Sequence, residues 1–346
     1  MGPVTEPGVH LAAGRDRRGD IEAWARAHGG RVGLDGVLAD LNRTAREVFN
    51  TGSAATWAFA WDDEDNDSQR WWPQGITSSA DADPGEEYAG RRLLVTTSYS
   101  KTIDKLNKGC RITVVEVSEE QPIRYRHVLL VAVGLDDVGR PELRPVHAHA
   151  GGAVWNGSYL HVAATTSGVH TFHLDDVMAV PTEVGLGHRY VLPLRTSWAA
   201  RTADGAEPMR YSFLSLDRDA ADRRLLAGEY GNGRASKRLL TYPLAPDGLI
   251  RADETGLAVP AVLADGPSKM QGAVSVNGRL HVVTSNGKRG KGSLWVGEPG
   301  ALRQAARVLP PGPEDITYWP SREELWTVTE YPGRRLVLAL DPRRFT

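Results

Sequence analysis

The chain has little of what would tie it to export, to a membrane or to a polyanion. Its 346 residues include one cysteine, Cys110, so an intrachain disulfide is excluded and folding needs no oxidising compartment. No apolar run approaches the roughly 18 residues that a membrane-spanning helix needs. The formal net charge of -2 gives no reason to expect a nucleic acid or an acidic membrane as a partner.

The first residues also lack the pattern of a secretory signal. Residues 1–7 read Met-Gly-Pro-Val-Thr-Glu-Pro and hold neither a basic stretch nor an apolar stretch. We therefore expect a cytoplasmic protein, or a secreted one if the natural chain carries a signal ahead of these residues.

Three common motifs of nucleotide sites and nucleophilic enzymes are missing as well. The sequence holds no phosphate-binding P-loop, no Gly-x-Gly-x-x-Gly between a strand and a helix, and no Gly-x-Ser-x-Gly elbow. We therefore expect no organic cofactor.

What the sequence does have is a unit that recurs from residue 73 onward. Each unit has a kink with small or polar residues, a short β-run, a second β-run that ends in polar residues, a turn and a third β-run. The five units cover residues 73–117, 150–175, 211–242, 270–296 and 313–340.

A strand meander repeated every ~40–60 residues is typical of a β-propeller. One unit alone cannot bury both faces of its sheet, and packing sheet on sheet around an axis buries them. We predict an all-β fold, a β-propeller with five blades preferred, and six possible if residues 190–200 form a degenerate blade. Residues 127–133 and 190–194 would supply fourth strands, and residues 52–62 would complete the last blade and close the ring.

The region before the repeats has a different pattern. Residues 1–18 are rich in Gly, Pro and Arg without periodicity, so we expect a loose tail. Residues 19–51 are expected to form a short helical appendage of two amphipathic helices, the second running from Asp35 to about Phe49. These helices would either cap the propeller of residues 52–346 or form a lid over its site.

Glycine stands in three of the five kinks, as Gly75, the pair Gly151-Gly152, and Gly272. The innermost strands of a propeller converge on its axis and crowd one another. We predict that these glycines allow the close approach of neighbouring strands.

The kinks and second strands resemble those of a known group of proteins. The segments concerned are Pro73–Thr77, Leu93–Ser98, His149–Gly152, Gly228–Gly231, Gln271–Val274, Gly312–Ile316 and Leu325–Glu330. They look like those of actinobacterial, mostly secreted, five-bladed β-propeller proteins of unassigned function. The resemblance covers about residues 72–346. It implies a cytoplasmic relative used in specialised metabolism, and it gives no residue a catalytic role.

Propellers usually place ligands at one mouth of the axial channel, where parts of every blade converge. Two sets of equivalent positions in the repeats are polar, as expected of such a mouth. The kinks carry Gln74, His149, Tyr211, Gln271, Glu314 and Asp315. The ends of the second strands carry Tyr99, Glu229, Tyr230, Glu330 and Tyr331.

Side-chain chemistry separates catalytic from binding roles in this set. The predicted catalytic residues are Glu314, Glu229 and Glu330 as acids or bases, His149 as a base, and Tyr230 as a donor to a developing anion. The predicted ligand-binding residues are Gln74, Tyr99, Tyr211, Gln271, Asp315 and Tyr331. The alternative is structural, because such side chains could instead bind channel water and pin the blades together.

A histidine pair next to the second kink raises the question of a metal. His147 and His149 are two residues apart, so in a strand both imidazoles would face one side and could share a divalent metal. The spacing reveals no third ligand, and we expect no metal site.

Two classes of function remain open. The first is an enzyme of specialised, natural-product metabolism that acts on a small-molecule substrate by cofactor-independent acid/base chemistry, as a lyase, cyclase or hydrolase. The second is a non-catalytic propeller that binds a ligand or a protein, as lectins and scaffolds do. The kinks carry different side chains in different units, which favours a single site over several similar ones. No oligomeric state is predicted.

Overall fold

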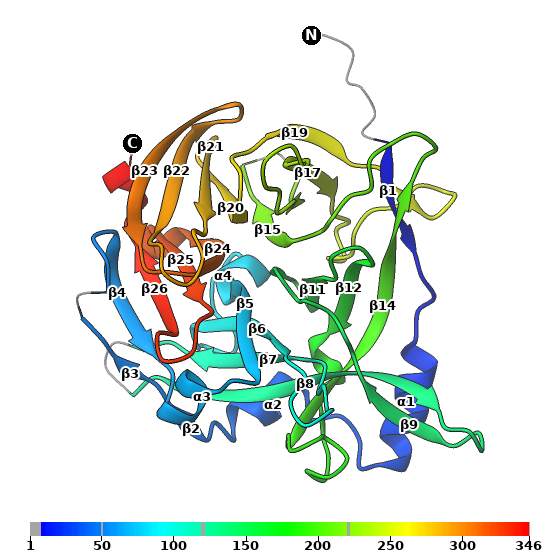
Figure 1. The fold of residues 1–346 in the computed structure, drawn as a ribbon. Coiled ribbons are helices and arrows are strands. Elements are labelled where there is room, and N and C mark those ends of the chain that lie inside the picture. The colour runs from blue at the N-terminus through cyan, green and yellow to red at the C-terminus, as the bar shows by residue number, and fades with distance from the viewer. Residues whose placement is uncertain (1–7, 50, 119–121, 220–221, 346) are drawn as a thin grey trace.

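The computed structural model describes residues 8–49, 51–118, 122–219 and 222–345. Its strands form five blades around a common centre, which confirms the predicted all-β propeller with five blades (Figure 1). Neighbouring strands within each blade pair antiparallel.

Each blade has four principal strands, which follow one another from the axis outward. Blade 1 holds β5 (Trp71–Ser78), β6 (Leu93–Ser100), β7 (Cys110–Glu116) and β8 (Arg124–Leu135). Blade 2 holds β10 (Ala153–Asn156), β11 (Tyr159–Ala163), β12 (Gly168–His173) and β14 (Tyr190–Thr202). Blade 3 holds β15 (Phe213–Asp217), β16 (Arg224–Gly228), β17 (Arg238–Pro243) and β19 (Ala261–Asp265). Blade 4 holds β20 (Met270–Val276), β21 (Arg279–Thr284), β22 (Gly292–Glu298) and β23 (Ala301–Leu309). Blade 5 holds β24 (Pro313–Trp319), β25 (Glu324–Thr329), β26 (Leu336–Leu340) and β4 (Ala55–Ala60).

The last blade closes the ring by combining both parts of the chain. Strand β4 pairs antiparallel with β26, with Ala60 opposite Leu336, as predicted for residues 52–62. This pairing ties the early chain to its last strand and removes an open sheet edge. Residues 190–200 belong to β14, so within the described residues they form no sixth blade.

Blades 1 and 2 are joined in a way that the repeats do not predict. Residues 190–193 of β14 pair in parallel with residues 128–131 of β8, so the two blades share one continuous sheet. Three short strands extend this sheet: β2 (Arg43–Thr44), β9 (Pro141–Pro145) and β13 (Met178–Ala179).

The N-terminal region differs from the prediction in two places. The sequence predicts a loose tail over residues 1–18, but residues 9–13 form a strand, β1 (Val9–Ala13). This strand pairs with β14 and with β18 (Leu257–Ala258). Residues 1–7 lie outside the described part. The first helix is present as α1 (Arg18–Ala27). The second, α2 (Gly33–Leu38), ends well before Phe49, because the chain then pairs with β8 and β4 through β2 and β3 (Arg46–Glu47). Long-range strand pairing overrides the local helical pattern in this region.

The two helices pack against the sheet that joins blades 1 and 2, on opposite faces, because neighbouring residues of a strand point to opposite sides (Figure 1). Ile21 and Trp24 of α1 pack with Leu129 and Val191. Leu34 and Val37 of α2 belong to the cluster that contains Val128. The helices therefore cap the parallel junction, and none of their residues lines the mouth described below.

The kink glycines lie where innermost strands touch, as predicted. A Cβ added at Gly152 would come within 2.1 Å of the backbone nitrogen of Leu214 on the next blade. One at Gly75 would meet Gly152, and one at Gly272 would meet Asp315, each at 2.7 Å. No real side chain fits such spaces, so glycine sets how tightly the ring closes.

The remaining helical turns are short. They are α3 (Asp63–Asp67), α4 (Ser79–Ala82) and the 3-10 turns Leu174–Asp176, Pro320–Arg322 and Pro342–Phe345. Helix α4 directly follows β5 and contacts the innermost strands β5, β10 and β24. Asp81 in α4 is buried and accepts hydrogen bonds from Thr317 and Arg218, so α4 fastens the channel end opposite the start of β5.

Candidate functional site

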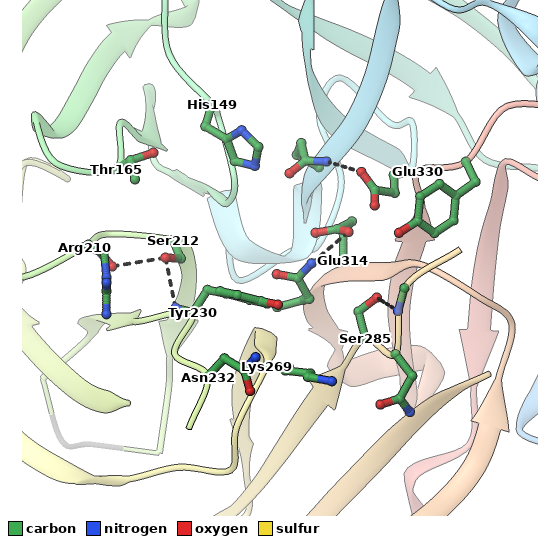
Figure 2. Close-up of a pocket in the computed structure, with 15 residues that line it drawn as sticks. His149, Thr165, Arg210, Ser212, Tyr230, Asn232, Lys269, Ser285, Glu314 and Glu330 are labelled. Atoms are coloured by element: carbon green, nitrogen blue, oxygen red, sulfur yellow. Dashed lines mark hydrogen bonds between the residues drawn. The ribbon is translucent and has the colours of Figure 1, made fainter. Parts of the chain in front are cut away.

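A polar pocket of about 760 Å³ lies at one mouth of the axial channel (Figure 2). From the starts of the innermost strands and the residues before them come Gln74, His149, Arg210, Ser212, Lys269, Gln271 and Glu314. From the ends of the second strands and the residues after them come Thr165, Tyr230, Asn232, Ser285, Asn286, Gly287, Glu330 and Tyr331. An antiparallel meander brings these two positions of each repeat to the same end of its blade. The volume falls within the range of small-molecule sites.

Two carboxyl groups lie at the floor of this pocket. Glu314 is on β24 and only 3% exposed, and Gln271 Nε2 donates a 2.9 Å hydrogen bond to its Oε1. Glu330 follows β25 and is half-buried, and Gln74 Nε2 donates to its Oε2 at 3.3 Å. Both carboxyls are therefore held by an amide donor from the innermost strand of a neighbouring blade.

The pKa values of this pair are raised. Burial raises the pKa of Glu314 well above its ordinary value, and the charges of Glu330 and Asp315 and a hydrogen bond to Glu330 add to the effect. Burial also raises the pKa of Glu330, although hydrogen bonds from Tyr331 and Gln74 and the charge of Lys101 work against this. A buried carboxyl beside a second carboxyl does not readily ionise, so Glu314 releases its proton at a higher pH than an ordinary glutamate does. The pair is therefore suited both to giving and to accepting a proton.

A row of rings follows the rim beside the pair. His149 is exposed to the pocket, with its ring centroid 4.6 Å from that of Tyr99. Trp72 lies 6.4 Å from Tyr99 and 5.8 Å from Tyr331, centroid to centroid. Desolvation by the walls of the mouth and the charge of Lys101 lower the pKa of His149. Its imidazole is therefore neutral at pH 7 and can accept a proton.

Tyr230 is the most open of the predicted residues in the mouth. It is 41% exposed, and Figure 2 shows its ring extending from blade 3 toward the floor. Its backbone nitrogen is held by Ser212 Oγ at 2.9 Å. The phenol is free to meet a ligand from one side of the pocket.

Glu229, predicted as a catalytic acid or base, does not line the pocket. It is fully buried, and Arg238 donates to both of its oxygens, from Nε at 2.9 Å and from Nη2 at 3.0 Å. The backbone nitrogen of Arg210 donates a further bond at 3.1 Å. Burial alone would raise the pKa of Glu229, but these hydrogen bonds lower it below its ordinary value. The carboxylate thus stays charged and anchors the loop beneath Tyr230.

Three predicted binding residues also lie behind the lining. Tyr211 is buried, and its hydroxyl lies 2.7 Å from that of Tyr242 inside blade 3. Asp315 is buried on the axis, where one oxygen accepts from the backbone nitrogens of Ile76 and Ala153, both at 3.2 Å. Tyr99 reaches the pocket only through its contact with His149. These residues support the mouth rather than face it.

The structure brings the other seven predicted residues together around the pocket. They are Gln74, His149, Tyr230, Gln271, Glu314, Glu330 and Tyr331. The prediction missed Arg210 and Lys269, which stand one or two residues before a kink position. A basic residue just outside a recognised repeat resembles an ordinary surface residue, so only its place next to a kink could have indicated its role.

Several non-glycine residues at the mouth have left-handed backbone conformations. Thr165, with φ 51°, and Lys269, with φ 65°, line the pocket, and Ala150, with φ 55°, follows His149. This conformation is uncommon for residues other than glycine and is a genuine outlier for a β-branched residue such as Thr165. Strain of this kind is typical of functional sites.

The described residues hold no cluster of metal ligands. Among them, no three or more His, Cys, Asp or Glu side chains gather in a way that could hold a metal ion. His147 is exposed and lies outside the pocket lining that contains His149. No helix in the described ranges has the length and apolar character needed to span a membrane.

Comparison with known proteins gives only distant likenesses. No protein-family model matches the chain, and no curated protein matches it in sequence. A gluconolactonase from Xanthomonas campestris has 12% identity and a TM-score of 0.36 over 90% of this chain and 98% of its own. The PQQ-bound aldose sugar dehydrogenase of Streptomyces coelicolor has 13% identity and a TM-score of 0.35, covering 87% and 99%. The β-propeller domain of Cps50 (Swd1) from Myceliophteria thermophila has 12% identity and a TM-score of 0.33, covering 72% and 93%.

These likenesses are too weak to bear on the chemistry. The fold rests on the strand pairing of the chain itself, and the site rests on its side chains. The expected relation to actinobacterial propellers is met at the level of the fold, while the source of the chain and its cytoplasmic location stay predictions.

Proposed function

We propose that the protein is an enzyme that moves protons on a small polar metabolite at the mouth of the propeller. The observation that carries this proposal is the pair of carboxyls Glu314 and Glu330 at the floor of a polar pocket, each bound by an amide from a neighbouring blade. A general acid and a general base work best when their pKa values lie near the working pH, and both carboxyls are shifted upward toward it.

The two carboxyls differ in a way that suggests their roles. Glu314 is the more buried, and it keeps its proton most strongly, so we assign it as the acid. Glu330 is half-buried and accepts hydrogen bonds from Gln74 and Tyr331, so it ionises first and acts as the base. Tyr230 and Tyr331 would donate hydrogen bonds to charge that develops on the substrate.

The raised pKa values of the pair bear on the reaction class. A carboxyl that keeps its proton beside one that releases its proton first suits an elimination, an addition or a ring closure, in which one proton leaves and another arrives. We therefore favour a lyase or cyclase. Use in cytoplasmic natural-product metabolism is proposed from the resemblance of the repeats.

The unequal lining supports a single catalytic site rather than a lectin-like array. Blade 2 contributes His149, blade 3 Tyr230, blade 4 Lys269 and blade 5 Glu314. A non-catalytic lectin with one site per blade interface would be expected to repeat its side chains. The partner that fits is one small molecule.

The test starts from a substrate found among polar metabolites by thermal-shift screening. We expect Glu314→Gln to bind that substrate and to lose turnover by about 10²- to 10⁴-fold. Glu298→Gln is the control, because Glu298 is an exposed carboxylate on β22 outside the mouth. Full turnover in both Glu314→Gln and Glu330→Gln would exclude the proposed acid/base pair.

A further inference from the structure

Two cations in the mouth have no acidic partner. Arg210 precedes β15 of blade 3, and Lys269 precedes β20 of blade 4. Within the described ranges, neither side chain forms an ion pair or donates a hydrogen bond to the protein. Nε and Nη2 of Arg210 are buried without any hydrogen-bond partner. A ligand in the pocket can therefore be met only by the rest of the guanidinium and by Lys269. Leaving charged donors without a protein partner is costly, which favours an acceptor supplied by a ligand at this wall.

The nearby carboxyls are committed elsewhere. Glu229 touches Arg210 only through the backbone nitrogen, because its charge is paired with Arg238. Glu314 is bound by Gln271, and Glu330 is bound by Gln74 on the opposite side of the pocket. Among the described residues, the wall formed by Arg210 and Lys269 therefore has no acidic partner of its own.

The backbone at Lys269 points to the same conclusion. Lys269 has φ 65°, a conformation that glycine would adopt at lower cost. Two hydrogen bonds hold it there, from its nitrogen to Gly231 O at 2.7 Å and from Ser285 N to its oxygen at 3.2 Å. A strained lysine that is pinned to blade 3 and to the second strand of blade 4 indicates that its side chain is needed in this place.

We propose that Arg210 and Lys269 form an anion subsite that holds a carboxylate or phosphate group of the substrate. Figure 2 shows both side chains on the side of the pocket away from Glu330, with Asn232 between them. The anionic group would bind at this wall, and the reacting part of the same molecule would lie over Glu314 and Glu330. The substrate class is thus a small organic acid or a phosphate ester. Its assignment as a substrate rests on the proposed function, whereas its binding does not.

The subsite is tested by calorimetric titration of the full chain with two probes, inorganic phosphate and malonate. We expect the wild type to bind at least one of them, more weakly at higher ionic strength. Arg210→Gln and Lys269→Gln should each weaken binding by about tenfold or more, because each removes charge-assisted hydrogen bonds. The tighter probe distinguishes a phosphate ester from a carboxylic acid as the natural ligand.

Two further variants keep the result interpretable. Lys288→Gln changes an exposed cation of the neighbouring loop outside the lining and should bind as the wild type does. Lys269→Gly removes the cation while relieving the left-handed strain, so it should fold and still lose binding. Absence of binding of both probes to the wild type at tens of millimolar overturns the subsite, as does wild-type affinity in Arg210→Gln and Lys269→Gln.

The catalytic variant separates this inference from the proposed function. Glu314→Gln should bind phosphate or malonate with wild-type affinity, because it leaves the cationic wall intact. If it keeps full turnover while Arg210→Gln loses anion binding, the subsite stands and the acid/base role fails. If Glu314→Gln loses turnover while neither probe binds the wild type, the acid/base role stands and the anion subsite fails.

Discussion

Gln271 Nε2 donates a 2.9 Å hydrogen bond to Glu314 Oε1, which joins the innermost strands of blades 4 and 5 at the floor of the mouth. Gln74 makes the corresponding bond from blade 1 to Glu330, at 3.3 Å. An amide can orient a carboxyl but cannot neutralise its charge as a cation would. Burial therefore raises the pKa of both carboxyls, and the neighbouring charge of Glu330 raises that of Glu314 further, as suits a proton-transfer pair.

Because the innermost strands approach so closely, we predict that a single added methyl group strongly lowers the stability of the fold. Gly152→Ala should destabilise the protein by several kcal/mol or prevent folding, because the added Cβ meets Leu214 N at 2.1 Å. Gly19→Ala is the matched control, since nothing lies within 4 Å of its added Cβ on α1. Alanine there should be neutral or stabilise by up to about 1 kcal/mol. Urea unfolding of both variants checks this, and equal stability would contradict the packing at the axis.

A buried network beside the ring closure predicts that substitutions of two neighbouring aspartates differ in their cost to stability. Asp65 accepts from Arg111 Nη2 and from the hydroxyl of Tyr125, both at 2.8 Å. Asp65→Asn should cost about 3–5 kcal/mol, because it leaves Arg111 buried without its counter-charge. Asp63 on the same helix is 80% exposed in its pair with Arg46, and Asp63→Asn should cost at most about 1 kcal/mol. Thermal unfolding of both variants measures this difference, and equal losses of stability would contradict it.

Buried histidines predict a loss of stability in mild acid. Burial lowers the pKa of His161 and of His281 to about 4, and that of His188 to about 3. The unfolded chain binds protons at these sites below about pH 6.5, while the folded chain does not until the lower pKa is reached. Each histidine therefore removes about 1.4 kcal/mol of stability per pH unit as the pH falls through this window.

His161→Gln isolates one of these contributions. His161 is fully buried between Thr171 and the carbonyl of Gly248, and glutamine does not titrate. Between pH 6.5 and about 4, the stability of the variant should fall less steeply than that of the wild type, by about 1.4 kcal/mol per pH unit. Unfolding curves with the same slope in both proteins would show that His161 is not buried neutral.

Much of the fold could be predicted from the sequence because its signals are local and repeated. Kinks, β-runs and turns recur in each unit, and glycine stands at Gly75, Gly152 and Gly272, where strands meet at the axis. The positions that form the mouth followed from the same alignment of repeats. Equivalent positions in a closed ring converge whatever side chains they carry.

The parts that could not be predicted depend on contacts between distant residues. The parallel pairing of β8 with β14 and the early end of α2 are set by partners far along the chain. The role of Glu229 depends on Arg238, which lies on the neighbouring strand and leaves that carboxylate no free oxygen. Nothing in the residues around Glu229 distinguishes it from Glu330, which stands at the same position of its own repeat.

The buried acid also predicts how stability changes toward alkaline pH. The folded state keeps the Glu314 proton that the unfolded state releases above about pH 4.3, so this contribution is full in acid and is lost as the pH rises. Glu314→Gln should therefore gain stability relative to the wild type as the pH rises above about 4.3, by up to about 1.4 kcal/mol per pH unit. Glu298→Gln should show no such trend, and a constant difference for Glu314→Gln would contradict the raised pKa.

The most direct test of the proton-sharing pair is a pH titration of the glutamate side-chain carboxyls by carbon-13 NMR, with Glu314→Gln used to assign the resonance. We predict that Glu314 titrates well above the ordinary glutamate value and that its pKa falls in Glu330→Gln, where the neighbouring charge is gone. A Glu314 carboxyl that titrates near the ordinary glutamate value of about 4.3, unchanged by Glu330→Gln, would contradict the pairing of the two carboxyls.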